Sequence, residues 1–300
     1  MESGGCNCGG EAYRIKPSAI PGFTVVELLV VVSIISVLAA VMLPVLVEVR
    51  RRARAAACMR NQQQVVGGVN LFAIDHDNRY PESVATIGFD DNWNWQEPTM
   101  MTAYRRRSPG LYRSMGAYLG DYIEDVGTMS CPSAPGRYRY LQQSWDAGED
   151  WDNPDTGPIP DPVKGTYCFY WNYTGLLEDG LFQGPRDLFG DCGGSKLLVG
   201  DYFGYDHWRS PQACGASERF AAARVTEQTY VSSPYWSGEP SDAFDPSAVE
   251  IKLNAGYADG HVESYSGSEV ATMKVIMDLE TLEPYQYGPG DFYLPLNGLP

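Results

Sequence analysis

The longest apolar stretch of the chain runs from Leu28 to Val47, twenty consecutive residues without a charged side chain. At the rise of an α-helix, about 1.5 Å per residue, this stretch spans about 30 Å, which matches the hydrocarbon core of a bilayer. The pattern therefore predicts a transmembrane helix over about residues 23–47. Glu27 lies near the start of this helix, where an unpaired carboxylate is costly, so we expect it to have a specific partner.

Apolar side chains continue at helical spacing after the charge-free stretch, with arginines and glutamines between them. This pattern predicts an amphipathic continuation of the helix over 48–75, with its apolar face packed on the rest of the chain. The expected apolar stripe consists of Val45, Val49, Ala53, Ala56, Ala57, Met59, Val65, Val66, Val69 and Phe72.

Three local features modify this long helix. Pro44 has no N–H to donate to the carbonyl of Ala40, so we expect a kink or a local opening of the helix there. Gly67 and Gly68 weaken the helix because glycine loses the most backbone freedom on folding. The polar run Asp75–Asn78 should end it.

The remainder, residues 76–300, is predicted to be β-rich with long loops, because aromatic residues there alternate with Gly, Pro, Asn and Asp. The clearest hairpin pairs residues 251–257 with 261–265 through a turn at Asp259-Gly260, and residues 197–199 form another expected strand. Residues 268–282 suit a short surface helix. The fold class is therefore α+β, with a long N-terminal helix packed on an antiparallel, loop-rich head.

The residues around the start of the apolar run, Gly22-Phe23-Thr24-Val25-Val26-Glu27-Leu28-Leu29-Val30, form a recognisable motif. They resemble the processing site of type IV prepilins and of type II secretion pseudopilins. The resemblance implies cleavage between Gly22 and Phe23 by prepilin peptidase and N-methylation of Phe23 by the same enzyme. It divides the chain into a leader (1–22), an N-terminal helix (23–75) and a globular head (76–300) with a pilin-like fold.

The resemblance also implies roles in filament assembly for two residues of the helix. Glu27 would pair with the N-terminal amine of a neighbouring subunit, because a buried cation and a buried carboxylate compensate one another. Pro44 would mark the place where the helix melts locally as the subunit packs into the filament. The implied partners are copies of this chain and other pilin-like subunits, the peptidase, the inner-membrane assembly machinery and membrane lipid.

Later segments are similar to a large-headed group of prepilin-type proteins that is abundant in planctomycetes. The similarity involves residues 58–65, residues 75–81 and Cys131-Pro132-Ser133, and it ends with the Asp-Gly processing-associated motif at residues 254–262. That C-terminal motif often has a histidine ten residues before its aspartate, and here the position is Val249. No role of that histidine is carried over to this chain.

The flanking charges and the resemblance predict opposite membrane orientations. Five arginines between residues 50 and 60 follow the apolar run, and a count of cations would place the following residues in the cytoplasm. The resemblance implies a single-pass protein of the inner membrane with a cytoplasmic N-terminus and a head outside, in a periplasmic or extracellular filament. We expect the second orientation because the cleavage motif is more specific than a charge count.

The net charge of −16 is concentrated in the expected head, where residues 76–300 carry fifteen basic and thirty-three acidic groups. This excess argues against nucleic acid as a partner, since phosphate binding requires a basic face. The acidic groups between residues 146 and 155 could supply oxygen ligands for calcium, although a solvated acidic loop is the simpler interpretation. These weak calcium candidates are Asp146, Glu149, Asp150, Asp152 and Asp155.

Four cysteines of the expected head could form disulfides after export, in three complete pairings that the sequence does not separate. They are Cys131, Cys168, Cys192 and Cys214. No close Cys-x-x-Cys pair is present among them, so zinc is not expected. Calcium is the one cofactor that the sequence leaves possible.

We do not expect an enzyme, because the sequence contains no phosphate-binding glycine loop and no nucleophile elbow. Asp259 and His261 could be imagined as an acid–base pair, but adjacent turn residues explain them without chemistry. The main functional hypothesis is a structural subunit of a type IV pilus-like or type II secretion pseudopilus filament. The alternative is a membrane-anchored exported protein that binds glycan or another surface polymer through its aromatic head.

Overall fold

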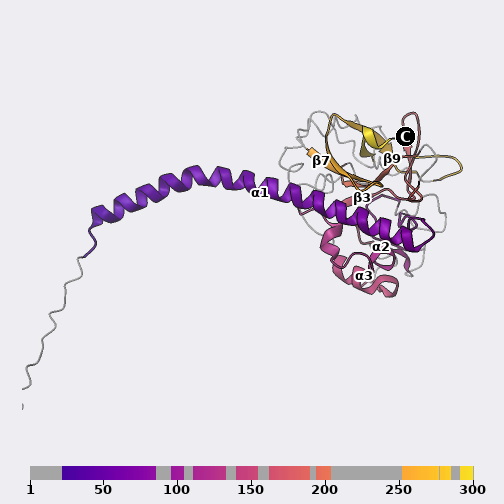
Figure 1. The fold of residues 1–300 in the computed structure, drawn as a ribbon, viewed down its shortest axis with the longest axis horizontal. Helices are drawn as coiled ribbons and strands as arrows, with labels where there is room; N and C mark the ends of the chain where they lie inside the picture. Colours follow the sequence, from indigo (N-terminus) through magenta and orange to yellow (C-terminus); the bar gives the residue numbers. More distant parts are fainter. Residues whose placement is uncertain are drawn as a thin grey trace, which may run out of the picture. The chain divides into compact units, whose positions relative to one another are not determined.

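The computed structural model describes residues 22–85, 96–104, 111–132, 140–154, 162–189, 194–203, 252–276, 278–284 and 291–299. The chain divides into two compact units, Met1–Arg50 and Arg51–Pro300. The helix α1 (Val25–Asp75, indigo to purple in Figure 1) contains residues of both units and continues through Pro44. The predicted end of the helix is confirmed, and a local opening at Pro44 stays a prediction for the filament.

Within its described residues, the second unit combines three antiparallel sheets with short helices. A two-stranded sheet pairs β1 (Thr102–Tyr104) with β2 (Leu111–Ser114). One four-stranded sheet has the order β10 (Asp291–Pro295), β9 (Val270–Lys274), β4 (Thr174–Leu177), β5 (Gly180–Gln183). The other has the order β3 (Tyr167–Phe169), β6 (Leu197–Asp201), β7 (Lys252–Tyr257), β8 (Val262–Ser266). The helices are α2 (Met115–Leu119), α3 (Leu141–Ala147) and the 3-10 turns η1 (Val126–Met129), η2 (Gly148–Asp150) and η4 (Leu296–Gly298).

Together with α1, these sheets confirm the α+β class, an N-terminal helix and a β-rich antiparallel region. The predicted hairpin is present as β7 and β8, in which Leu253 lies opposite Tyr265. The turn between the two strands contains Gly260 at φ +92°, a conformation that glycine adopts without strain. The expected strand at residues 197–199 is also present, as β6.

The predicted surface helix over residues 268–282 is wrong. Residues Val270–Lys274 form β9, which lies between β10 and β4 and pairs with both. Ser268 does not cap a helix, because a strand follows it. In the turn before this strand, the N–H and Oγ of Ser266 donate to Glu269 Oε2 at 2.8 Å each. Pairing with strands far away in the sequence outweighed the local 3.6-residue pattern, which is the usual limit of such patterns.

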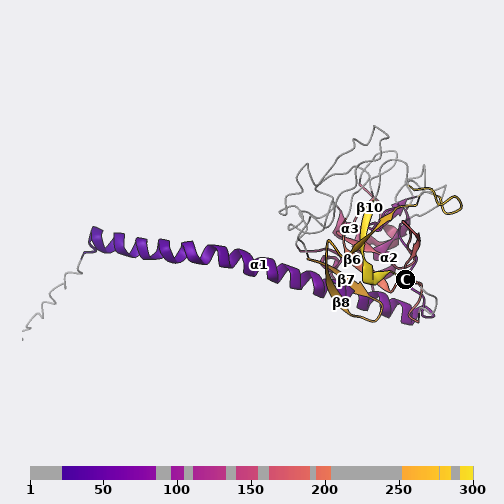
Figure 2. The same ribbon diagram turned by 90° about the horizontal axis from the view of Figure 1, so that it is seen from above.

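The C-terminal half of α1 lies in the core of the second unit. Figure 1 shows this half with α2 and α3 on one side and β3 and β7 on the other, and Figure 2 shows β7 and β8 beside it. Two glycines allow this close packing. A Cβ on Gly68 of α1 would lie 2.6 Å from Ile123 Cγ1, and a Cβ on Gly256 of β7 would lie 2.9 Å from Val66 Cγ2.

The buried stripe of α1 differs in part from the expected one. Its members are Cys58, Gln62, Val65, Val66, Gly68, Val69 and Ala73. Of the predicted positions, the valines at 65, 66 and 69 are buried and Phe72 is half-buried, whereas Ala53 and Ala56 are exposed. The predicted stripe starts too early in the chain. Alanines at helical spacing match an apolar pattern even where no other part of the protein packs on them.

Candidate functional site

The first unit presents an apolar helical surface. The large hydrophobic side chains from Phe23 to Val49 are between 44% and 79% exposed. This part of α1 is also long and apolar enough to cross a membrane. So much exposed apolar area is unfavourable in water, and a bilayer or other protein chains could cover this surface.

Both residues of the expected cleavage site lie before the first residue of α1. Gly22 and Phe23 are exposed, and a Cβ placed on Gly22 would meet no atom within 4 Å. The peptide bond between them therefore lies outside the helix and is open to solvent.

Glu27 has a partner within its own chain. Thr24 donates to Glu27 Oε2 from its backbone N–H at 2.9 Å and from its hydroxyl at 2.7 Å, while the Glu27 N–H donates to Thr24 Oγ1 at 3.2 Å. This reciprocal arrangement is a capping box, which satisfies N–H groups at the start of a helix. The Thr-x-x-Glu spacing is visible in the sequence, so this local partner of Glu27 could have been predicted beside the expected contact between subunits.

The two serines of the apolar stretch are also satisfied locally. Ser33 Oγ donates to the Val30 carbonyl and Ser36 Oγ donates to the Val32 carbonyl, each at 2.7 Å. Such bonds to the preceding turn remove the hydroxyl groups as free polar sites. Both serine hydroxyls are therefore used within the helix, and they do not make its surface more polar.

A buried polar network joins α1 to two strands of the second unit. Asp201, the last residue of β6, is 2% exposed. Its Oδ1 accepts from Cys58 Sγ and from Gln62 Nε2, both at 3.0 Å. Its Oδ2 accepts from the Asn254 backbone N–H at 2.8 Å and from Asn254 Nδ2 at 3.2 Å. A buried carboxylate needs such donors, so Asp201 fixes α1 against β6 and β7.

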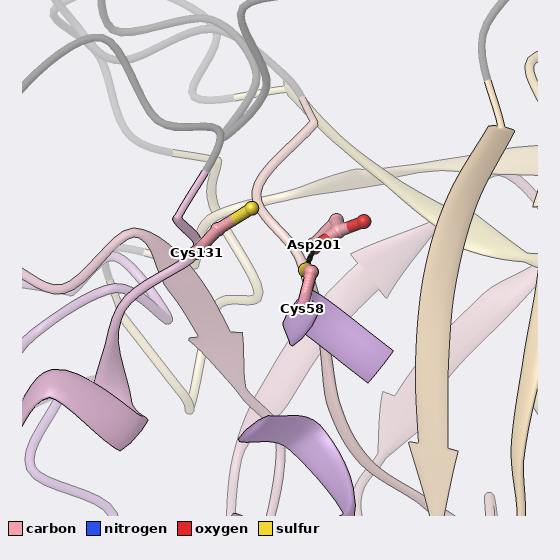
Figure 3. Close-up of side chains that lie close together, drawn as sticks. All are labelled: Cys58, Cys131 and Asp201. Atoms are coloured by element: carbon pink, nitrogen blue, oxygen red, sulfur yellow. Dashed lines mark hydrogen bonds between the residues drawn. The ribbon is translucent and has the colours of Figure 1, made fainter. Parts of the chain in front are cut away.

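A second cysteine, Cys131, lies close to Cys58 and Asp201. Cys131 follows η1, and its Sγ lies within 4.8 Å of both Cys58 Sγ and the nearest Asp201 oxygen. Figure 3 shows the side chain of Cys131 close to those of Cys58 and Asp201, and Cys58 contacts Asp201. The Tyr167 hydroxyl lies 3.4 Å from Cys58 Sγ, and the Cys131 N–H donates to Thr166 Oγ1 at 2.7 Å.

The environment keeps the Cys58 thiol and the Tyr167 hydroxyl protonated. The pKa of the Cys58 thiol is raised well above its usual value by a hydrogen bond with Cys131, by burial and by the negative charge of Asp201. The pKa of Tyr167 is likewise raised, first by burial and then by the two neighbouring cysteines. Cys58 is thus a hydrogen-bond donor to Asp201 and not a reactive thiolate.

The structure brings together few of the other predicted site residues. Cys131 and Cys168 carry free thiols, and Cys192 and Cys214 lie outside the described residues, so the predicted disulfides among these four stay a prediction. Cys58 was not among the expected partners. Its neighbours in the fold are distant in the sequence, and no local signal shows them.

The calcium candidates do not form a cluster where the structure describes them. Asp146 belongs to α3 and accepts from Gln142 Nε2 at 2.8 Å. Among the described residues, the group of His, Cys, Asp and Glu side chains with ligand spacing is Cys58, Cys131 and Asp201. Glu149, Asp150 and Asp152 do not belong to such a group, and Asp155 lies outside the described residues.

The aromatic side chains that the structure describes in the head mostly build its core. The three described tryptophans, Trp145, Trp151 and Trp171, are buried. Phe189 is the strongly exposed aromatic side chain of the described part of the head, at 78%. An open platform of stacked rings, which glycan binding uses, is therefore not present on the described part of the head.

Asp259 and His261 lie in the β7–β8 turn. Their side chains contact one another and are more than half exposed, and the imidazole stacks on Tyr257 with ring centroids 4.4 Å apart. The Asp259 carboxylate also accepts the His261 backbone N–H at 3.2 Å, as turn residues commonly do. The pair therefore has a complete structural explanation in the turn.

No family model matches this chain, and no curated protein or solved structure is significantly similar to it.

Proposed function

We propose that this protein is a structural subunit of a type IV pilus-like or type II secretion pseudopilus filament. In this proposal, prepilin peptidase removes residues 1–22 and methylates Phe23, and the N-terminal half of α1 first holds the subunit in the inner membrane. The same half then packs against neighbouring subunits, with the acidic, pilin-like head outside. The protein has a structural role and not a catalytic one.

The observation that carries the proposal is the exposed apolar surface of the first unit. From Phe23 to Val49 the chain presents large exposed hydrophobic side chains, and Glu27 is the only carboxylate between Phe23 and Val47. Membrane anchoring alone explains the apolar surface. The glycine–phenylalanine junction and a glutamate at the fifth position after it support the further step of processing and assembly.

Glu27 has two tasks under this model of assembly, capping α1 in its own chain and pairing with the N-terminal amine of a neighbour. Two substitutions separate these tasks. Glu27→Gln keeps a side chain that can close a capping box but removes the charge, whereas Thr24→Ala removes the cap but keeps the charge. Because the amine–carboxylate pair requires the charge, Glu27→Gln should reduce filament yield at least tenfold without preventing cleavage after Gly22.

The matched variant Thr24→Ala should be cleaved and should assemble at close to the normal yield. The measurement is the amount of processed protein in sheared surface material relative to the amount in membranes, determined by immunoblot. Normal assembly of Glu27→Gln would contradict the pairing role. Loss of assembly in Thr24→Ala alone would assign Glu27 to capping.

A further inference from the structure

Two thiols of the second unit meet although they come from distant parts of the chain. Cys58 lies in the buried stripe of α1, and Cys131 lies in the segment after η1. Their sulfur atoms are within 4.8 Å of one another, and both side chains are buried, at 1% and 5% exposure. Formation of a bond between them requires the sulfurs to approach to about 2.05 Å, a shift that rotation about the Cα–Cβ bonds can contribute to.

We propose that Cys58 and Cys131 form a disulfide that locks the C-terminal half of α1 to the head. The bond forms after the head reaches an oxidising compartment, and in this respect the inference rests on the export that the proposed function requires. The cross-link would join α1 to the head of the same subunit, so that tension on α1 is passed to the head through a covalent bond.

The chemistry is thiol–disulfide exchange with an external disulfide, either a small molecule or an oxidoreductase. One cysteine, as its thiolate, attacks the external disulfide, which gives a mixed disulfide and releases one thiol. The second cysteine then attacks the mixed disulfide and releases the second thiol. Two cysteine thiols and one external disulfide thus become one protein disulfide and two external thiols, with protons and electrons in balance.

Burial determines when this exchange takes place. An external disulfide cannot reach two side chains that are almost fully covered, so oxidation has to occur while α1 is still docking on the head. After the bond has formed, Cys58 no longer donates to Asp201, but Asp201 keeps the donors from Gln62 and Asn254. Loss of the hydrogen bond from Cys58 therefore still leaves the Asp201 carboxylate with hydrogen-bond donors.

The same three residues resemble a metal site, but their hydrogen bonds favour the disulfide. Both oxygens of Asp201 already accept hydrogen bonds from Gln62 or Asn254, so a cation would have to displace these donors. Structural zinc sites use four ligands, and this group supplies three.

Peptide mapping of the full-length protein tests the inference directly. The protein is purified in detergent after refolding in a buffer of oxidised and reduced glutathione, blocked with an alkylating agent and digested with trypsin without reduction. Trypsin places Cys58 in the peptide 55–60 and Cys131 in the peptide 114–137, and each contains a single cysteine. The expected result is one linked peptide pair, whose mass is about 2 Da below the sum of the free peptides and which separates on reduction.

Thermal unfolding gives a second readout. The cross-link closes a long loop, so the oxidised protein should melt about 5–15 °C above the reduced protein. Cys58→Ala and Cys131→Ala should each abolish this difference. Cys168→Ala is the matched control, because Cys168 is buried in the neighbouring strand β3 and has no part in the proposed bond, so oxidation should still raise the melting temperature of this variant.

Several results would overturn the inference. These are alkylated, unlinked peptides 55–60 and 114–137 from the oxidised wild-type protein, a link from either cysteine to a different one, or one equivalent of bound zinc with both thiols protected. The mapping needs no variant, so it remains decisive if an alanine substitution prevents folding. It also needs no filament, so failure of the disulfide and failure of the filament proposal are distinguishable.

Discussion

The two halves of α1 are built from different side chains and are stabilised in different ways. From Val25 to Val47 the helix is almost entirely apolar, and its side chains are exposed. From Cys58 to Ala73 it alternates small, apolar and amide side chains, and its inner face is buried. One continuous helix can therefore meet two different demands, insertion among apolar neighbours and a specific fit to its own head.

The polar contacts of the two halves show the same contrast. In the first half, Ser33 and Ser36 bond to carbonyls of the helix itself, and Thr24 bonds to Glu27 at the start of the helix. In the second half, amide side chains reach other elements. Asn61 Nδ2 donates to the carbonyl of Ser130 and Asn70 Nδ2 donates to that of Ala258, each at 3.0 Å. Local bonds leave the first surface free for other chains or lipid, whereas long-range bonds fix the second.

Removal of the first half should produce the largest effect. A chain that begins at Arg51 keeps the whole second unit, including the buried stripe of α1. We expect this chain to move from the membrane fraction to the soluble fraction and to unfold cooperatively on heating, because it has lost the exposed apolar surface. Ultracentrifugation and circular dichroism provide the two measurements.

The full-length chain is the control and should remain with membranes until detergent is added. A truncated chain that is unfolded would show that the two halves of α1 are not independent. A full-length chain that is soluble without detergent would remove the need for a bilayer or for neighbouring subunits.

Loss of the buried carboxylate should be the next largest effect and should be confined to the second half. Asp201→Ala deprives donors on Gln62 and Asn254, as well as Cys58, of their acceptor. A buried donor without an acceptor is costly, so we expect the free energy of unfolding to fall by about 3–5 kcal/mol.

The matched control is Asp152→Ala, because this carboxylate is exposed and lies outside the core. It should change the free energy of unfolding by less than about 0.5 kcal/mol. Urea denaturation of the chain that begins at Arg51 measures both variants. Equal stability of the two would mean that Asp201 does not hold α1 on the sheet.

The smallest expected change in the free energy of unfolding comes from substitution of two adjacent glycines in the C-terminal half of α1. A Cβ on Gly68 would overlap Ile123, whereas a Cβ on Gly67 would meet no atom within 4 Å. Gly68→Ala should therefore lower the free energy of unfolding by about 1–3 kcal/mol. Gly67→Ala should raise it by about 0.5–1 kcal/mol, because alanine is the better helix former. Opposite signs in urea denaturation are the expected result, and stabilisation by both would place the close contact elsewhere.

The sequence predicts those parts of the fold whose signals are local. The sequence predicts the helix α1, its end at Asp75 and the β7–β8 hairpin, because each of these depends on residues that are close together in the chain. The identity of β9 could not be predicted, since its backbone pairs with β10 and β4, which are distant in the sequence.

The same division applies to the candidate site. The Thr24–Glu27 box is a local motif, and the apolar surface follows directly from composition. The Cys58–Cys131–Asp201 group joins three distant segments, and Gln62 lies in the buried stripe although a hydrophobic pattern excludes it. Buried polar partners are selected by the tertiary fold, and a single sequence does not show which of them meet.

The most direct test of the account is the intact mass and N-terminal sequence of the protein recovered from native membranes and from sheared surface material. We expect a chain that begins with N-methylated Phe23 in both fractions, with the leader removed by cleavage after Gly22. A chain that retains residues 1–22 in both fractions would contradict processing and filament assembly and would leave a plain membrane anchor.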